Sequence, residues 1–343
     1  MRSFHNILVT GGCGFIGANF INFLFGKSSS KFSFFTKCDF EGIVVNVDLL
    51  TYAAHPENLC QEIKEHPRYF FEKADICDKQ KIRKIFEKYQ IDTVVHFAAE
   101  SHVDRSIGDP EIFTRTNVCG TQTLLECAKE CWKNKKNDCL FHFVSTDEVY
   151  GSLGSSGTFI ETSNYSPNSP YSASKASAEL MVMAYWHTYG LPVTISNCSN
   201  NYGPYQDREK FIPLMISNMA EGLSLPLYGT GNNVRDWIYV EDHNNAVWTI
   251  LKKGRIGQKY NIGSSNEIKN NELLQKLIEK TSVITKRDVA ELKRLIKHVN
   301  DRPGHDFRYS IDATKIKEEL GWKPLVDFEI GLEKTVRWYL HKL

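Results

Sequence analysis

The feature of this sequence that most restricts its fold is a glycine-rich turn close to the N-terminus. Ile7–Thr10 is a short apolar run that predicts a strand, and three glycines follow it at three-residue intervals. A tight turn and a close approach of backbone to a pyrophosphate both need glycine, and a helix N-terminus favours the phosphate charge. The segment therefore predicts a dinucleotide-binding turn. Its predicted contacts are Gly11, Gly14, Phe15, Ile16 and Gly17.

Apolar runs alternate with helical segments through residues 1–197, which predicts an α/β fold with a doubly wound, Rossmann-type parallel sheet. The chain after residue 198 is rich in Asn, Gly and Pro. We expect a dinucleotide-binding domain at 1–197 and a smaller substrate-binding lobe at 198–343, with about 235–263 packing back onto the first domain. The predicted strands are 7–10, 43–48, 69–74, 93–97, 140–145 and 192–195. The predicted helices are 78–89, 111–134, 170–188, 210–222, 270–281, 312–320 and 328–341.

Polar or small residues end several predicted strands, where parallel sheets gather their chemistry. Asp48 ends the second strand, and a carboxylate there binds ribose hydroxyls and repels a 2′-phosphate, which favours NAD over NADP. It lies 31 residues after Gly17 instead of about 20, and we interpret Ser28–Glu41 as a surface insertion. Asp75-Ile76 is expected at the adenine, although Asp75 could instead begin the next helix. Ala98-Ala99 is small enough to let the cofactor pass.

Two further motifs carry reaction chemistry. Tyr171 and Lys175 lie one turn apart on a predicted helix, and a neighbouring ammonium favours the phenolate of a tyrosine. This pair predicts a base for a sugar or alcohol hydroxyl whose carbon loses hydride. Thr146 precedes the adjacent carboxylates Asp147 and Glu148 after the fifth predicted strand. Removal of water needs one acid and one base, so the motifs together predict oxidation combined with elimination.

The bulk properties exclude several classes of protein. Lysine and arginine total 42 against 41 acidic residues, a balance that argues against a nucleic-acid or membrane surface. The nine cysteines are scattered without a Cys-x-x-Cys pair, so neither a metal site nor a disulfide framework is indicated. We find no apolar signal region and no stretch long enough to span a bilayer, and we expect a cytoplasmic protein.

Taken together, these motifs resemble the extended short-chain dehydrogenase/reductase family, and specifically its nucleotide-sugar 4,6-dehydratases acting on dTDP-glucose or UDP-glucose. The similarity spans essentially the whole chain, and Thr146-Asp147-Glu148 is its most specific part, because the related epimerases lack the acidic pair. The matching stretches are Thr10–Gly17, Asn46–Tyr52, Phe97–Ile107, Ser145–Gly151, Tyr171–Lys175, Asn197–Tyr205, Arg235–His243 and Asp301–Asp306.

The resemblance implies a role for each matching residue. Tyr171, assisted by Thr146 and Lys175, would take the O4 proton of the sugar while C4 gives hydride to NAD. Glu148 would then remove the C5 proton, and Asp147 would protonate the departing C6 hydroxyl. Further implied cofactor contacts are Leu49, Thr51, Ser101, Thr116, Tyr171, Lys175 and Asn201. Implied substrate contacts are Ser101, Thr146, Asn200, Lys210, Phe211, Arg235, Asn270, Arg302 and His305.

Other expectations also follow from the resemblance. A homodimer would form through the helices at about 111–134 and 170–188, and the product would enter deoxysugar biosynthesis, of which rhamnose is one example. The sequence departs from the family at Gln206-Asp207-Arg208 and at Gly263-Ser264-Ser265, which affects the expected shape of those loops. The alternatives are a nucleotide-sugar 4-epimerase, a C6 decarboxylase, or a nucleotide-sugar-binding protein without activity. The choice between uridine and thymidine stays open.

Overall fold

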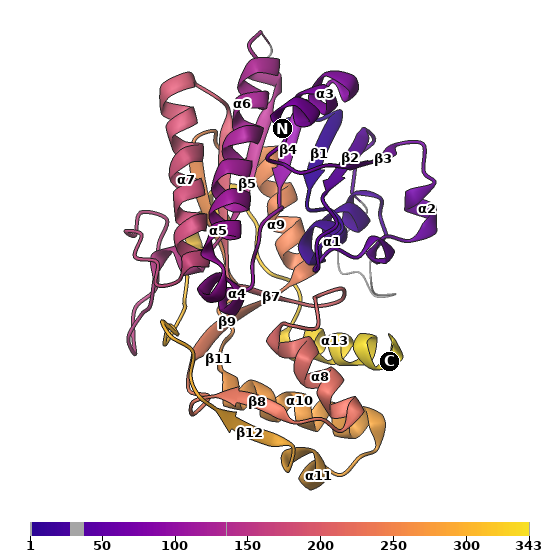
Figure 1. Cartoon of the computed structure of the whole chain (residues 1–343), viewed down its shortest axis with the longest axis vertical. Helices are drawn as coiled ribbons and strands as arrows, with labels where there is room; N and C mark the ends of the chain where they lie inside the picture. Colours follow the sequence, from indigo (N-terminus) through magenta and orange to yellow (C-terminus); the bar gives the residue numbers. More distant parts are fainter. Residues whose placement is uncertain (1, 28–37, 135, 343) are drawn as a thin grey trace.

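The computed structural model describes residues 2–27, 38–134 and 136–342, so most of the predicted insertion Ser28–Glu41 lies outside the described residues. Its main feature is a seven-stranded sheet with the order β10-β6-β5-β4-β1-β2-β3 (Figure 1), in which every neighbouring pair is parallel. The strand order reverses between β1 and β4, and ligands of such sheets bind at that point. The strands are β1 Asn6–Thr10, β2 Ile43–Asp48, β3 Tyr69–Lys73, β4 Thr93–His96, β5 Leu140–Thr146, β6 Val193–Cys198 and β10 Gln258–Ile262.

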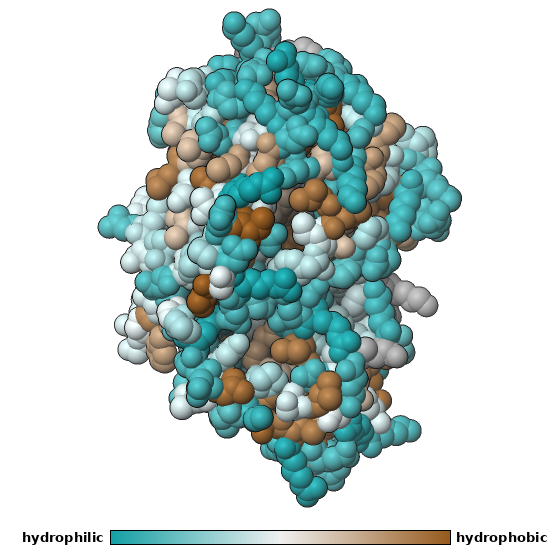
Figure 2. All heavy atoms as spheres, in the orientation of Figure 1, coloured by the Kyte–Doolittle hydropathy of each residue, from teal (hydrophilic) through white to brown (hydrophobic). Residues whose placement is uncertain are grey.

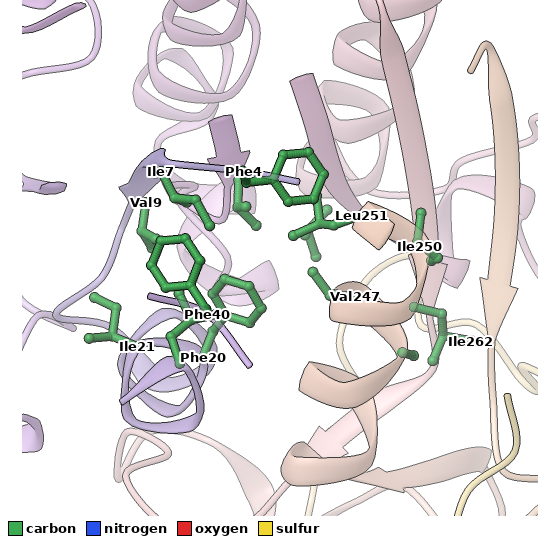
Figure 3. Close-up of a cluster of buried hydrophobic side chains, with 14 of the residues drawn as sticks. Phe4, Ile7, Val9, Phe20, Ile21, Phe40, Val247, Ile250, Leu251 and Ile262 are labelled. Carbon is green, nitrogen blue, oxygen red and sulfur yellow. The ribbon is translucent and has the colours of Figure 1, made fainter. Parts of the chain in front are cut away.

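The central strands of this sheet are buried throughout, because crossover helices pack on both of its faces. One face packs against α1 (Phe15–Leu24), α9 (Val240–Lys253) and α12 (Thr314–Leu320). Figure 3 shows this core, where Phe20 and Ile21 of α1 lie across from Val247 and Ile250 of α9. The opposite face packs against α3 (Lys79–Tyr89), α6 (Thr121–Cys131) and α7 (Pro170–Tyr189).

The single helix predicted at 111–134 is a composite. Pro110–Phe113 (α5) is α-helical, Thr114–Gly120 is a π-helical segment, and α6 follows it to Cys131. Asn117 lies inside the π segment, and its buried amide donates to Ser174 Oγ at 2.8 Å and to the Glu100 carbonyl at 3.0 Å. These bonds tie the segment to α7 and to the loop after β4. Segments of this kind occur frequently at functional sites.

A second lobe is built on its own hydrophobic core, which lies between helices and small sheets of the C-terminal part (Figure 1). We expected Arg235 in a loop because this part of the chain is rich in Asn, Gly and Pro, but it lies on strand β9 (Val234–Tyr239). Helix α9 was not predicted, because Glu241–Asn244 at its start are polar although all four are buried. The elements of this part are β7 Asn200–Tyr202, α8 Phe211–Glu221, β8 Leu225–Tyr228, β9 Val234–Tyr239, β11 Glu267–Lys269, α10 Asn270–Thr285, α11 Val289–Lys293, β12 Ile296–Val299 and α13 Phe328–Lys342.

Shorter helical turns complete the fold, and hydrophilic residues cover most of the face that Figure 2 shows. Within the described ranges, no helix combines the length and the apolar character needed to cross a membrane. The shorter elements are the 3-10 turns Pro56–Asn58, Lys136–Asp138 and Asp147–Tyr150, and the helices α2 Gln61–Lys64 and α4 Val103–Gly108.

Candidate active site

A deep pocket lies beyond the carboxyl ends of the sheet strands and continues to β7 and the loop before α8. Elements far apart in sequence meet there because parallel strands end at one edge of the sheet. Most of the residues predicted from sequence line this one pocket. They are Gly11, Gly14, Phe15, Ile16, Gly17, Asp48, Leu49, Thr51, Asp75, Ile76, Ala98, Ala99, Ser101, Thr116, Thr146, Asp147, Glu148, Tyr171, Lys175, Asn200, Asn201 and Lys210.

The three glycines of the turn are needed for two different reasons. Gly11 has a φ of +69°, and a Cβ there would come within 2.8 Å of the Ala98 backbone. A Cβ on Gly17 would lie 2.3 Å from the Gly11 carbonyl oxygen, whereas a Cβ on Gly14 would meet nothing closer than 3.3 Å. Gly14 is also the N-cap of α1, and no side chain caps that helix. The backbone N–H groups of the first turn can therefore bind an anion.

We expect Gly17→Ala to lower stability by about 2–3 kcal/mol, because the added methyl group overpacks the turn. Thermal unfolding without ligand should show a melting temperature lower by roughly 3–4 °C. Gly154→Ala is the matched control, since a Cβ there meets no atom within 4 Å, and its melting temperature should equal that of the wild type. Equal melting temperatures for the Gly17 variant and this control would contradict the packing argument.

The carboxylates after β2 and β3 are both held by backbone amides. Asp48 accepts hydrogen bonds from Cys13 N at 2.9 Å and from Leu50 N at 2.8 Å, which fixes it beside the glycine turn. Asp75 accepts from Cys77 N at 2.8 Å and from an Arg115 nitrogen at 2.6 Å. The N-cap of α3 is Asp78, so the alternative that Asp75 begins that helix is wrong.

The acidic pair occupies two contrasting environments. Asp147 is buried, and its pKa lies well above the ordinary value because of burial and the nearby charges of Glu148 and Asp236. Burial also raises the pKa of Glu148, but the cations Arg302, Arg235 and Lys210 oppose that rise. Carboxyl groups whose environments push their pKa values apart are typical of an acid and base pair. The pKa of both carboxyl groups is thus raised, and the cations near Glu148 make it the more readily ionised of the two, with Asp147 as the acid.

Thr146 connects this pair to the tyrosine. Its hydroxyl donates to Asp147 Oδ1 at 3.3 Å and accepts from Glu148 N at 3.3 Å. Burial raises the pKa of the Tyr171 phenol, and a hydrogen bond with Thr146 opposes that rise. One strand end thus places a hydroxyl, an acid and a base beside the start of α7.

The pair of Tyr171 and Lys175 differs from the sequence expectation. We predicted that the ammonium group favours the phenolate, but burial and the charge of Glu148 raise the pKa of Tyr171 well above 10. Lys175 Nζ donates to the Val144 carbonyl at 2.8 Å and lies 4.2 Å from the centre of the Phe143 ring. Burial lowers the pKa of Lys175 to about 8. We based the expectation on the charge of the Lys175 ammonium and did not include the burial of the two side chains.

Basic residues surround the Glu148 side of the pocket. Buried Arg235 of β9 donates to the carbonyl oxygens of Val234 and Asp306, at 2.8 and 3.0 Å, and its guanidinium lies 4.2 Å from the centre of the Tyr309 ring. Lys210 Nζ donates to the Ser101 carbonyl at 2.8 Å and so bridges the second lobe and the loop after β4. These positions suit recognition of phosphate oxygens.

Four predicted substrate residues lie farther out or serve the fold as well. Phe211 begins α8 and packs on the core of the second lobe. Asn270 stands just before Glu272-Leu273-Leu274, which suggests a helix N-cap, but it is the first residue of α10 and the N-cap is Lys269, so that expectation is wrong. His305 Nδ1 lies 2.5 Å from Asp301 Oδ1, and Arg302 lies 3.8 Å from Asp104. Together with Arg235, these residues lie outside the lining of the pocket.

The loop at Gln206-Asp207-Arg208, where the sequence departs from its family, closes over the pocket. His55 Nε2 lies 3.0 Å from Asp207 Oδ2, and the Tyr52 hydroxyl donates to Glu209 at 3.2 Å. These bonds join the loop after β2 to the loop before α8. At the other departure, Ser265 adopts a left-handed conformation with a φ of +58°, which glycine adopts at lower cost.

Several lining residues were missed by the sequence analysis. Glu209 and Asp207 come from a loop without periodicity, so only their proximity to Lys210 could have indicated them. Arg115 lies within the π-helical segment Thr114–Gly120, which was not predicted. The missed residues are Val47, Ala53, Ala54, Ala74, Phe97, Glu100, Ile112, Arg115, Val144, Ser145, Cys198, Ser199, Gln206, Asp207 and Glu209.

The sheet topology, the glycine turn and the Tyr-x-x-x-Lys helix define a protein of the extended short-chain dehydrogenase/reductase class. Residues 8–335 match the family described as GDP-mannose 4,6 dehydratase. The dTDP-glucose 4,6-dehydratase of Haemophilus influenzae is 51% identical, and the alignment covers 98% of each chain. The chain therefore belongs to the nucleotide-sugar 4,6-dehydratase family.

Solved structures agree with this assignment. The dTDP-glucose 4,6-dehydratase of Streptomyces venezuelae, crystallised with NAD, is 44% identical with a TM-score of 0.86, covering 98% of this chain and 97% of that one. The UDP-glucose 4-epimerase of Thermotoga maritima, crystallised with UDP-glucose, is 30% identical with a TM-score of 0.84, covering 98% and 99%. The fold is thus shared with an epimerase, and the residues of the site must decide the reaction.

Proposed function

We propose that this protein is an NAD-dependent dTDP-glucose 4,6-dehydratase, a lyase that converts dTDP-glucose to dTDP-4-keto-6-deoxyglucose and water. The observation that carries the proposal is the position of Asp147 and Glu148. Both carboxylates line the same pocket as Tyr171, in environments that favour one acid and one base. Two relatives named dTDP-glucose 4,6-dehydratase are 51% and 49% identical to this chain over 98% and 97% of its length, and they support the choice of reaction and nucleotide.

The residues of the pocket fit NAD. The uncapped N-terminus of α1 suits a pyrophosphate, and the Asp48 carboxylate suits ribose hydroxyls. Asn200 Oδ1 and Gln206 Oε1 are buried and have no hydrogen-bond partner among the described residues, so they offer acceptors to a polar ligand. When bound, the dinucleotide supplies reversible hydride transfer to and from the sugar. We propose that it occupies the domain of residues 1–197 and that the sugar lies between this domain and residues 198–343.

The side chains of the site would manage the protons. Tyr171 reacts as a phenolate that the Lys175 ammonium stabilises, and it accepts the O4 proton and becomes a neutral phenol as C4 loses hydride. The 4-ketone acidifies the C5 hydrogen, and Glu148 removes it as a proton. Asp147 donates its proton to the C6 hydroxyl, which leaves as water. Hydride is then returned to C6 and Glu148 returns its proton to C5, so the sugar loses one water without net oxidation.

The nucleotide diphosphate would lie on the basic side of the pocket. We propose that Arg235, Arg302 and His305 bind the diphosphate and base, with Asn270 at the outer end. Lys210, Phe211 and Asn200 would contact the sugar side. Arg235 and Arg302 both influence the pKa of Glu148, so an anionic substrate bound by them would lie next to the acidic pair.

Incubation of the purified protein with dTDP-glucose and, separately, UDP-glucose tests the proposal. We expect the dTDP product to be lighter by one water in mass spectrometry, and dTDP-glucose to react faster than UDP-glucose. The methyl group that distinguishes thymine from uracil contributes only about 1–3 kcal/mol of discrimination between the two substrates. Slower use of UDP-glucose therefore agrees with the proposal. An isomer of unchanged mass would indicate an epimerase, loss of CO₂ from a uronic acid a decarboxylase, and binding without reaction a binding protein.

We also propose a homodimer that forms through α6 and α7. Leu180 of α7 is 58% exposed, and α7 ends with exposed Tyr189, which supports burial of this face against a second copy. A cytoplasmic location is in keeping with the nine cysteines, all of which are free thiols. The 4-keto-6-deoxy product is a precursor for deoxysugars, and we propose rhamnose as one destination.

A further inference from the structure

Glu179 is a fully buried carboxylate that the proposed mechanism does not use. It lies on α7, one turn after Lys175 and two turns after Tyr171, so the three side chains share one face of the helix. Its exposed fraction is 0%. Burial of a carboxylate is costly unless hydrogen bonds and a counter-charge compensate for it. A residue of this kind needs a structural or functional explanation.

The carboxylate is held by partners from three other segments. Glu179 Oε2 accepts a hydrogen bond from the Tyr165 hydroxyl at 2.6 Å and lies 4.0 Å from Lys259 Nζ of β10. Oε1 accepts from Asn197 Nδ2 of β6, also at 2.6 Å. Lys259 Nζ in turn donates to the Tyr165 hydroxyl at 3.0 Å. The carboxylate therefore has a fixed position and a defined counter-charge.

Two connections lead from this carboxylate to the reacting groups. The Asn197 amide that donates to Glu179 also donates to the Thr146 carbonyl at 3.1 Å, which fixes the end of β5 before the acidic pair. The second connection is electrostatic, because the charge of Glu179 raises the pKa of Lys175 against the effect of burial.

The other titratable groups around these two residues have little charge at working pH. Cys198 of β6 also acts on Lys175, but burial raises the pKa of its thiol to about 12. Burial and Lys175 keep the pKa of His96 on β4 well below its ordinary value, so its ring is neutral. Burial raises the pKa of Glu179 itself, and the Lys259 cation together with the hydrogen bonds from Tyr165 and Asn197 opposes that rise. Burial and the Glu179 carboxylate also raise the pKa of Tyr150, whose hydroxyl is therefore neutral.

We propose that Glu179 is a positioning residue for this reaction: its buried carboxylate keeps Lys175 cationic and, through Asn197, fixes the strand end that carries Thr146. The inference rests on the dehydratase function proposed above. A cationic Lys175 is needed to stabilise the phenolate of Tyr171, so loss of the Lys175 proton should limit turnover at high pH. Removal of the Glu179 charge lowers the pKa of Lys175, and the alkaline limb of the pH profile should then move to lower pH.

The test measures kcat of the full-length enzyme with NAD and dTDP-glucose from pH 6 to 10. The alkaline limb of Glu179→Gln should lie about one pH unit below that of the wild type. Since kcat falls tenfold for each pH unit along this limb, the variant should be roughly tenfold less active than the wild type at the same alkaline pH between 7 and 9. Glu179→Asp keeps the charge and should restore the limb of the wild type. The control is Glu161→Gln, a nearby carboxylate that accepts from Asn261 N at 2.9 Å, and its limb should not move.

Other outcomes separate the possible failures. An active wild type whose alkaline limb coincides with that of Glu179→Gln overturns this inference and leaves the dehydratase function intact. A wild type that does not dehydrate dTDP-glucose overturns both. If Glu179→Gln does not fold, Lys259→Gln takes its place, because Lys259 opposes the rise that burial causes in the pKa of Glu179. Without that cation Glu179 is less ionised and supports the Lys175 charge less, so the limb should move to lower pH, and an unmoved limb would contradict the proposal.

Discussion

Replacement of Asp147 by Asn should stop the loss of water while oxidation at C4 continues. Asn keeps the shape of the buried side chain, but its amide is not acidic enough to protonate the departing C6 hydroxyl. A positioned acid or base contributes about 10²–10⁴-fold to a rate, so dehydration should fall by that factor. Glu148→Gln should have the same effect, because the C5 proton then has no base. The unpartnered Oδ2 of Asp147 is the atom expected to face the leaving hydroxyl.

Single-turnover experiments distinguish the two stages. The absorbance of the reduced cofactor follows C4 oxidation, and mass spectrometry follows the loss of water. In both variants the reduced cofactor should accumulate, since its hydride has no acceptor at C6. Glu161→Gln is the control carboxylate and should show neither change. Complete dehydration by both variants at the wild-type rate would exclude the proposed acid and base.

The sheet was predictable because its strands are buried on both faces. Val94-Val95 is apolar, and Leu140–Val144 is apolar except for the buried His142, and such runs identify central parallel strands. Helix α9 was missed for the opposite reason, since buried polar residues such as Asp242 and His243 conceal its apolar face. The π segment was also missed, because it depends on the bonds of Asn117 with Ser174 and with the loop after β4. Long-range contacts decide such details, and local periodicity does not record them.

The same distinction explains the site. Asp48 and Thr146 could be predicted because each lies at a strand end, and a parallel sheet brings such ends together. Asp207 and Glu209 could not, because long-range contacts, among them those with His55 and Tyr52, hold the loop before α8 at the pocket. Burial is the other quantity that the sequence concealed. It reverses the expected pKa of Tyr171 and makes the charge of Lys175 depend on a carboxylate farther along α7.

Tyr171→Phe should lower turnover by about 10²–10⁴-fold without a comparable loss of stability. The ring would stay packed between Val103 and Phe113, with the two ring centres of Tyr171 and Phe113 6.4 Å apart. Only the hydroxyl is lost, and burial already raises its pKa, so removal of this polar atom relieves a desolvation cost. Thermal unfolding should therefore give a melting temperature close to that of the wild type.

The matched control for this variant is Tyr260→Phe. It also removes a tyrosine hydroxyl, but Tyr260 lies outside the lining of the pocket. Tyr260 donates to Glu319 at 3.1 Å, and loss of that bond should cost about 1 kcal/mol of stability with normal turnover. We therefore expect the Tyr171 variant to lose activity and keep its stability, and the Tyr260 variant to lose stability and keep its activity. A Tyr171 variant that unfolds early and keeps its turnover would make that hydroxyl a structural group, and the O4 proton would need another base. The Thr146 hydroxyl lies between the Tyr171 hydroxyl and the acidic pair. This position argues for a catalytic role of Tyr171.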